Sequence, residues 1–394
     1  MHKTLTMHLN IAWTANKGAD ADTGHEAEQY MQQWLPVNTF VMTDQQPDII
    51  LFMSGGSERQ ALEMIQPERP VLLLSIRGNN AYAAATEVMA WMVSHGRFAM
   101  LSDCQDAFET GLLNHWQQMV NTWQGFYGKK AGLIGRVSDW LVASAVPAER
   151  FRRQFGITLE EIPWSTLPDY NGMLPDTALI ERFHGQNIQG LNQAAQVLAV
   201  LRQTMVRHKL CAMAVECFSL VQQRKVTACL ALAQLNTEGA VAACEGDLAS
   251  MAGMLLLGAF AGNVPWMANT TRITAKTLLL SHCTVPFNMI EKPSLTSHYE
   301  TDCSLAIKGS IQAKEVTIFR LSGPLDKAFI AEGTVLDYPD LPSACRTQLE
   351  IELPAASLLQ MRNQPLGNHL VMVPGSYGKI LRLACLYRGI KMIE

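Results

Sequence analysis

Apolar and polar residues follow two different patterns along this chain, and the change comes near residue 276. In the first third, apolar runs at 47–56 (PDIILFMSGG), 69–76 and 97–103 are separated by segments with helical spacing, among them 81–96 (AYAAATEVMAWMVSHG). Strands that alternate with helices are typical of parallel βαβ units. This pattern predicts an N-terminal α/β domain.

A second alternating region begins at 129–146 (KKAGLIGRVSDWLVASAV), which predicts a strand, a Gly-Arg turn and a helix with Ser138 as its N-cap. A long helix is expected at 188–208. The strand 211–221, the helix 227–239 and the strand 240–247 (AVAACEGD) continue the alternation. We therefore expect a second Rossmann-like domain with a parallel sheet.

After residue 276, apolar and polar residues alternate along the chain with a period of two. The segments 303–311, 315–321, 329–338 and 345–353 alternate apolar and polar residues between Gly or Pro turns, and 378–394 returns to a helix and a final strand. This is typical of an antiparallel sheet that closes into a small barrel. The expected domains are an N-terminal α/β domain at 1–128, a central α/β domain at 129–275, and a barrel-like domain at 276–394.

Composition narrows the class of protein. The chain has 394 residues, 48% of them hydrophobic and 17% charged, and a net charge of −4 without a basic run, so no nucleic-acid partner is expected. The nine cysteines never occur as C-x-x-C, which favours reduced thiols in a cytoplasm. The N-terminus does not have the pattern of a signal peptide, and the apolar run 251–262 is shorter than the roughly 20 residues of a membrane span. We expect a cytoplasmic protein with no membrane partner.

Two acids stand directly before the most apolar segment of the chain. Glu245 and Asp247 lie at the C-terminal end of the predicted strand 240–247 and precede the helix that contains 251–262. Sites in open α/β sheets form at this edge, and a helix N-terminus favours carboxylates. The alternative is that Asp247 is only an N-cap and Glu245 its capping partner.

Further polar residues lie where other strands are expected to end. They are Asn269 in PWMANTT, His282 in LLLSHCTVP, His298, Glu300 and Asp302 in SHYETD, and His369 in PLGNHLVMVPG. A single histidine at such a place is more often structural than a ligand. Several of them together favour a metal site, although spacing alone does not show that they converge.

The stretch 243–269 (ACEGDLASMAGMLLLGAFAGNVPWMAN), together with 278–286 and 365–390, resembles the L-fucose/L-arabinose isomerase superfamily, and in particular its short bacterial fucose isomerase-like branch. The resemblance runs from about residue 130 to the end, with FMSGGSE (52–58) as the best match before it. It implies three domains and an aldose–ketose isomerase that uses Mn²⁺ or another divalent cation, with no nucleotide cofactor. It also implies a trimer or hexamer in which the N-terminal domain covers the active site of a neighbouring subunit.

The resemblance also assigns roles. Glu245 stands where the family has the glutamate that binds the metal and moves the proton, and His369 and His282 stand where it has histidine ligands. The family's second acidic ligand is missing, because Ala268 and Asn269 occupy that place. An amide oxygen can ligate a cation but cannot remove a proton. We therefore expect Asn269 in the metal shell and either Asp247 or Glu300 as the second acid; the chemistry could also run with one carboxylate and water.

Other polar positions are expected to bind the substrate. They are Arg136 and Ser138 in LIGRVSDW, Gly55 and Gly56 in FMSGGSE, Glu216 in AVECFSLV, Glu300 and Asn368. The glycines would let backbone N–H groups approach a ligand, and the alternative for both motifs is turn geometry with an N-cap. Glu216 could orient the substrate or instead pair with Arg136 or Arg224. Neither glycine segment is a G-x-G-x-x-G fingerprint, so a dinucleotide is not indicated.

The expected function is a ketol isomerase that acts on an open-chain sugar through an enediol, with L-fucose, D-arabinose or L-arabinose as substrate. Two alternatives remain open. One is the isomerisation of a sulfonated glucose (sulfoquinovose), whose sulfonate Arg136 or Arg77 would bind. The other is a sugar-binding or regulatory protein that has lost turnover, which the missing acid at 268–269 favours.

Overall fold

The structure is a computed structural model that describes residues 8–16, 18, 22–183 and 188–393. Residues 1–7, on which the expectation about a signal peptide rests, lie outside this part. The chain divides into two compact units, residues 1–125 and residues 126–394. No helix in the described ranges has both the length and the apolar character needed to cross a membrane.

The first unit is a parallel five-stranded sheet with the order β2-β1-β3-β4-β5. Its strands are β1 (Leu9–Thr14), β2 (Phe40–Met42), β3 (Ile49–Phe52), β4 (Val71–Ser75) and β5 (Ala99–Asp103). Its helices are α1 (Thr23–Met31), η1 (Val37–Thr39), α2 (Glu58–Met64), α3 (Ala81–Ser94), α4 (Cys104–Glu109) and α5 (Leu112–Phe126), the last reaching the boundary. The order reverses between β1 and β3, where doubly wound sheets bind ligands.

The second unit begins with a parallel four-stranded sheet of order β7-β6-β8-β9. Its strands are β6 (Lys130–Ile134), β7 (Thr158–Ile162), β8 (Leu210–Val215) and β9 (Val241–Cys244). Its helices are α6 (Ala148–Phe155), η2 (Trp164–Thr166), η3 (Tyr170–Gly172), α7 (Thr177–Arg182), α8 (Leu191–His208), α9 (Phe218–Arg224), α10 (Cys229–Thr237) and α11 (Leu248–Ala261).

An antiparallel barrel completes the second unit. Six strands close in the order β14-β17-β10-β11-β16-β15 through the pairing of β14 with β15, and β18 adds to β15. They are β10 (Trp266–Ile273), β11 (Thr277–His282), β14 (Glu315–Leu321), β15 (Lys327–Asp337), β16 (Thr347–Glu352), β17 (His369–Pro374) and β18 (Lys391–Met392). The other elements are η4 (Phe287–Met289), the hairpin of β12 (Ile290–Thr296) and β13 (Ala306–Ile311), and helices α12 (Ala355–Asn363) and α13 (Gly378–Tyr387).

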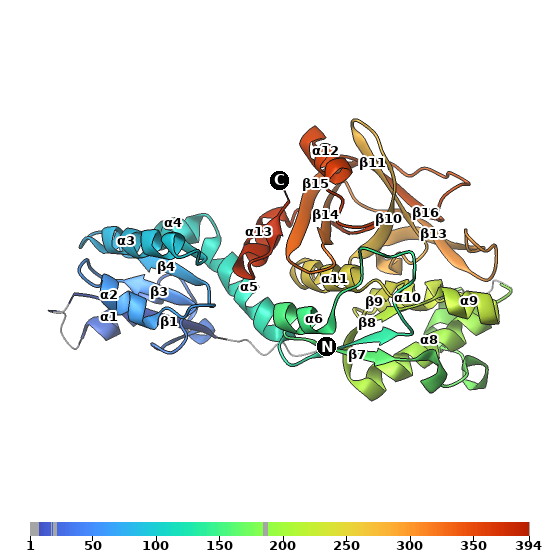
Figure 1. The fold of residues 1–394 in the computed structure, drawn as a ribbon, viewed down its shortest axis with the longest axis horizontal. Helices are drawn as coiled ribbons and strands as arrows, with labels where there is room; N and C mark the ends of the chain where they lie inside the picture. Colours follow the sequence, from blue (N-terminus) through green and yellow to red (C-terminus); the bar gives the residue numbers. More distant parts are fainter. Residues whose placement is uncertain (1–7, 17, 19–21, 184–187, 394) are drawn as a thin grey trace. The chain divides into compact units, whose positions relative to one another are not determined.

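The predicted fold class is confirmed: two parallel α/β sheets precede an antiparallel barrel. The barrel sheet begins with β10 at Trp266, ahead of the expected change at 276. Helix α11 explains the apolar run 251–262, because it packs on β9 on one side and on barrel strands β14 and β17 on the other (Figure 1). A helix that is covered all round must be apolar all round.

The helix predicted after Ser138 is wrong. Residues 135–147 form bends and turns, and the next helix, α6, begins at Ala148. A Cβ on Gly246 would lie only 2.3 Å from the carbonyl oxygen of Arg136, so this loop packs directly on the turn after β9. The Ser138 N–H donates to the Glu245 carbonyl at 3.1 Å, and Ser138 is therefore tied to that turn instead of starting a helix.

Candidate metal centre

The turn that follows β9 sets the direction of the Glu245 side chain. Glu245 and Gly246 both have left-handed backbones, with φ of 59° and 67°. For a residue with a Cβ this conformation costs about 1–2 kcal/mol, and such strain gathers at functional sites. Gly246 cannot carry a side chain there because of its contact with Arg136. The left-handed backbone of Glu245 is therefore a local strain that sets the direction of the Glu245 carboxylate.

Asp247 shows why a second acid stands beside the apolar helix. It is fully buried as the N-cap of α11, and its Oδ1 accepts the Ser250 N–H at 2.7 Å. Its Oδ2 accepts from the Ser250 hydroxyl at 2.9 Å and from Arg320 Nη1 at 3.2 Å. Burial by itself raises the pKa of Asp247, but Arg320 and the contact with His369 lower it well below its usual value. Asp247 is therefore ionised inside the protein.

Glu245 meets two histidines that come from the barrel. His282 ends β11 and His369 begins β17, and one ligand atom of each of these three residues lies within 4.8 Å of the others. Glu245 Oε1 is 3.9 Å from His282 Nε2 and 3.5 Å from His369 Nε2. All three side chains are buried. The sheet supplies one ligand and the barrel supplies two.

Each member of this triad is oriented by a neighbour. His369 Nδ1 lies 2.9 Å from Asp247 Oδ2, and His282 Nδ1 lies 3.0 Å from the Thr284 hydroxyl. Trp140 Nε1 donates to Glu245 Oε2 at 2.6 Å. These contacts leave Oε1 and both Nε2 atoms facing one another, as in metal sites where a carboxylate or hydroxyl holds the far nitrogen of a histidine ligand.

Burial and the charges of the neighbouring side chains shift the pKa values of all three triad residues. Burial raises the pKa of Glu245, but the contact and charge of His369, followed by His282 and Trp140, outweigh it and lower the pKa to about 2. Burial lowers the pKa of His369, yet Asp247 and Glu245 raise it to about 9. Burial and the nearby His369 lower the pKa of His282 to about 3. At neutral pH the ionised carboxylate of Glu245 and the neutral imidazole of His282 therefore face a protonated, positively charged His369.

These residues fit a divalent cation. Within the described chain, the buried Nε2 of His369 has no hydrogen-bond partner, which is rare for a buried polar atom. Ligands bound at about 2.1 Å from one ion lie about 3–3.5 Å apart, close to the 3.5 and 3.9 Å found here. The buried Glu245, His282 and His369 could therefore hold a divalent metal ion.

The two asparagines expected near the ion are bound to each other. Asn269 pairs in register with His369 across β10 and β17, so it lies beside the triad. Its Oδ1 accepts the Asn368 side-chain N–H at 2.6 Å, and its Nδ2 lies 3.7 Å from Cys345 Sγ. Asn269 as a fourth ligand and Asn368 as a substrate contact both stay predictions.

Glu300 belongs to a separate polar pair. Its Oε2 lies 3.1 Å from His298 Nε2, and its Oε1 accepts from Cys345 Sγ at 3.4 Å. Burial lowers the pKa of His298, whereas Glu300 and then Glu245 act to raise it, so the pair lies within electrostatic reach of the triad. A role in acid–base chemistry or substrate binding remains a prediction.

The other candidates in this unit have partners of their own. Arg136 is exposed and pairs with Asp139 at 3.1 Å, and Arg224 lies 3.7 Å from Asp169. Glu216 is buried and accepts the Ser219 N–H at 3.0 Å. The alternative in which Glu216 pairs with Arg136 or Arg224 is therefore wrong, because Glu216 binds the first turn of α9 and both arginines pair with other acids. A role of Glu216 in orienting the substrate stays a prediction.

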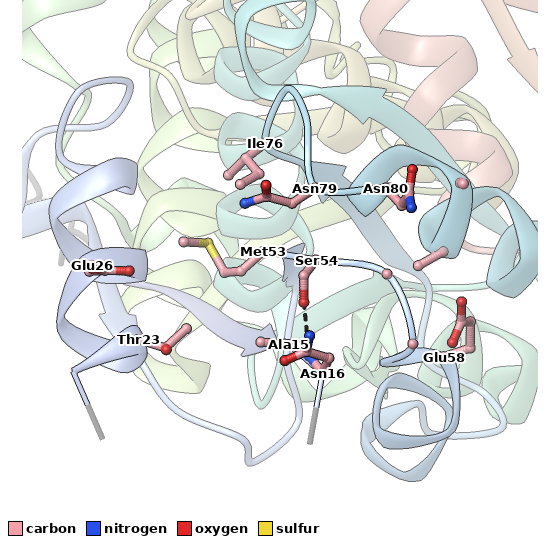
Figure 2. Close-up of a pocket in the computed structure, with 14 residues that line it drawn as sticks. Ala15, Asn16, Thr23, Glu26, Met53, Ser54, Glu58, Ile76, Asn79 and Asn80 are labelled. Carbon is pink, nitrogen blue, oxygen red and sulfur yellow. Dashed lines mark hydrogen bonds between the residues drawn. The ribbon is translucent and has the colours of Figure 1, made fainter. Parts of the chain in front are cut away.

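Gly55 and Gly56 lie in the first unit and line a cavity of about 790 Å³ at the carboxyl ends of its strands (Figure 2). The Gly55 N–H donates to the Asn79 carbonyl at 2.7 Å, so this N–H holds the loop together. A Cβ on Gly55 would lie 2.9 Å from Asn80 Cβ, and Gly56 has a φ of 77°. Arg77 pairs with Asp103 at 3.2 Å. Substrate binding by the glycines stays a prediction.

Four residues around the candidate metal centre were not predicted. Each contacts Glu245, Asp247 or a histidine of the triad; they are Trp140, Ser250, Thr284 and Arg320. Thr284, two positions after His282, could have been suspected from its spacing. Trp140 lies 105 residues before Glu245 in a loop predicted to be helical, so no sequence signal joins them.

Comparison with known proteins identifies no relative. No protein-family model matches the chain, and no curated protein matches it either. A function for this chain must therefore be inferred from its fold and from the geometry of the triad.

Proposed function

We propose that the chain is a metal-dependent aldose–ketose isomerase whose ion is Mn²⁺, bound by Glu245, His282 and His369. The observation that carries this proposal is the buried triad in which one ligand atom of each residue lies within 4.8 Å of the others. Oxygen and imidazole ligands suit Mn²⁺, whereas thiolates would favour zinc. The resemblance of the EGD segment and the late histidine to sugar isomerases supplies the reaction type.

The residues of the centre have separate tasks. Glu245, His282 and His369 would hold the ion, which would supply Lewis acidity for the developing enediolate. Glu245 is ionised at neutral pH, and its Oε2, which among the described residues accepts only from Trp140, would carry the proton between the two carbons while Oε1 faces the histidines. Such proton transfer is typically worth about 10²–10⁴-fold. Asp247 holds His369 in place, because its oxygens are already occupied by Ser250, Arg320 and His369. Asn269, whose Oδ1 accepts the Asn368 side-chain N–H, pairs in register with His369 and would lie close to the substrate oxygens.

The proposed substrate is an open-chain aldose such as L-fucose, D-arabinose or L-arabinose. The proposed setting is a cytoplasm, with the protein as a trimer or hexamer, as in the family that the sequence resembles. Light scattering of the purified protein measures the oligomeric state, and a monomer would contradict that part of the proposal.

The direct test is conversion of sugar. Protein loaded with Mn²⁺ is incubated with a panel of aldoses, and ketose is followed by ¹³C NMR. Glu245→Gln is expected to abolish turnover, while Glu149→Gln, an exposed residue of the same unit, leaves turnover unchanged. Absence of ketose from every aldose in the metal-loaded protein would contradict the proposal.

A second candidate is a sugar-binding protein without turnover. The observation that favours it is Asn269, an amide engaged with Asn368 at the place where the isomerases that the sequence resembles have a carboxylate. Calorimetry would then show sugar binding that Glu245→Gln does not change, with no ketose formed. Isomerisation of a sulfonated sugar has less support, since Arg136 and Arg77 are paired with Asp139 and Asp103.

A further inference from the structure

Trp140 combines two properties that rarely occur together. Its side chain is 52% exposed, although its indole N–H donates to Glu245, a buried member of the triad, at 2.6 Å. An exposed tryptophan with a satisfied N–H presents mainly apolar ring surface to solvent. Trp140 therefore places an open aromatic face directly beside the metal centre.

The aromatic contacts continue away from the triad through the half-buried Phe218 to the buried His298. The rings of Trp140 and Phe218 meet edge to face, 4.7 Å apart at 79°, and Phe218 meets His298 in the same way, 5.8 Å apart at 70°. His298 Nε2 in turn lies 3.1 Å from Glu300 Oε2. We call the Trp140–Phe218–His298 series the aromatic wall. It runs from Glu245 at one end to the His298–Glu300 pair at the other.

We propose that the aromatic wall binds the C–H face of an uncharged open-chain sugar, whose far hydroxyls reach the His298–Glu300 pair. This inference rests on the proposed function, because it assumes that the first oxygens of the sugar lie at the triad. A sugar chain has an apolar C–H face and a polar hydroxyl face, so it can pack on a ring and bond to polar groups at both ends of the wall.

Charge favours an uncharged substrate. The ends of the wall carry the carboxylates of Glu245 and Glu300. Arg346, which acts on the pKa of His298, donates to the Ser297 carbonyl at 2.8 Å and to its hydroxyl. A sulfonate or phosphate at the far end of the sugar would meet the Glu300 carboxylate, and this like-charge contact disfavours an anionic group there.

The N–H of Trp140 gives it a positioning role as well. By holding Glu245 Oε2, it leaves Oε1 to face His282 and His369. Two substitutions distinguish the contribution of the aromatic ring from that of the indole N–H. Trp140→Phe keeps an aromatic face and removes the hydrogen bond, whereas Trp140→Ala removes both.

The test uses a ligand that cannot react. Binding of D-arabinitol and L-fucitol to the full-length Mn²⁺-loaded protein is measured by calorimetry. Trp140→Ala is expected to weaken binding about tenfold, the loss typical of one aromatic contact, and Trp140→Phe by less than about threefold. Val142→Ala is the matched control, because Val142 is 89% exposed in the same loop. It is expected to bind like the wild type.

Failure of this inference can be told apart from failure of the proposed function. Polyol binding that depends on Trp140 without conversion of any aldose would uphold the wall and contradict the isomerase. Conversion of aldoses with an unchanged KM in Trp140→Ala would uphold the isomerase and overturn the wall. Absence of polyol binding to the wild-type protein would overturn the wall. Tighter binding of a sulfonated sugar than of its neutral parent would overturn the preference for uncharged ligands.

Discussion

The two parallel sheets of this chain end in very different sites. In the first unit, the carboxyl edge of the sheet opens into a cavity whose polar residues, such as Asn16 and Asn79, are exposed (Figure 2). In the second unit, barrel residues His282 and His369 cover the end of β9 and bury Glu245. In the first unit, whose described residues form no barrel, the edge of the sheet is an open cavity. The barrel is what turns such an edge into a closed centre with strongly shifted pKa values.

The largest expected effect comes from removing a ligand that the barrel supplies. His369→Ala is expected to lose bound Mn²⁺ by more than about 100-fold in affinity, because one of three protein ligands and its link to Asp247 disappear together. Elemental analysis and calorimetry measure this. His95→Ala, in the first unit, should keep the metal. Full metal content in His369→Ala would contradict the claim that the barrel supplies metal ligands at the edge of the second sheet.

A smaller effect is expected when the supporting carboxylate is neutralised. Asp247→Asn keeps the shape of the N-cap but removes the charge that faces His369 and Arg320, so Mn²⁺ affinity should fall by about 10–100-fold. Circular dichroism checks that the fold remains. An unchanged affinity would mean that Asp247 only caps α11.

The shifted pKa values predict how metal binding depends on pH. The pKa of His369 is raised to about 9, so in the metal-free protein this imidazole carries a proton at pH 7 that the metal must displace. Mn²⁺ affinity should therefore rise by about tenfold for each pH unit from pH 7 and level off near pH 9. Calorimetry in buffers of different ionisation enthalpy counts the released proton. A flat profile from pH 7 to 9 would show that His369 is neutral in the metal-free protein.

The smallest effect belongs to the first unit. Gly56→Ala places a Cβ at a φ of 77° and should lower the free energy of unfolding by about 1 kcal/mol. Thermal denaturation measures this change. Mn²⁺ affinity should stay the same. A drop in affinity would contradict the expectation that the cavity of the first unit has no influence on the metal centre of the second unit.

Much of the scaffold can be predicted from the sequence, because apolar runs and period-two segments report burial directly. The strand before Glu245, the buried helix after Asp247 and the barrel strands β14, β15 and β16 belong to this part. The pairing of β10 with β17 could not be predicted, since pairing between segments about 100 residues apart leaves no local pattern in the sequence. The loop at Ser138 has helical spacing, which predicts a helix. Its contact with Gly246 overrides that preference.

The site is predictable only in part and for a similar reason. Glu245, His282 and His369 can be selected from strand ends and a resemblance, and the structure brings them together. The contacts that orient them depend on side chains from other elements, such as Trp140 in a loop and Arg320 on β14. Such contacts arise from tertiary packing and have no signature in one sequence.

Locating the ion is the measurement that bears most closely on the metal centre. Crystals soaked with MnCl₂ and measured at the manganese absorption edge should show one anomalous peak about 2.1–2.3 Å from Glu245 Oε1 and from the Nε2 atoms of His282 and His369. The cavity of the first unit should show none. A peak bound elsewhere, or no peak between these three side chains at saturating Mn²⁺, would contradict the metal centre on which the proposed function depends.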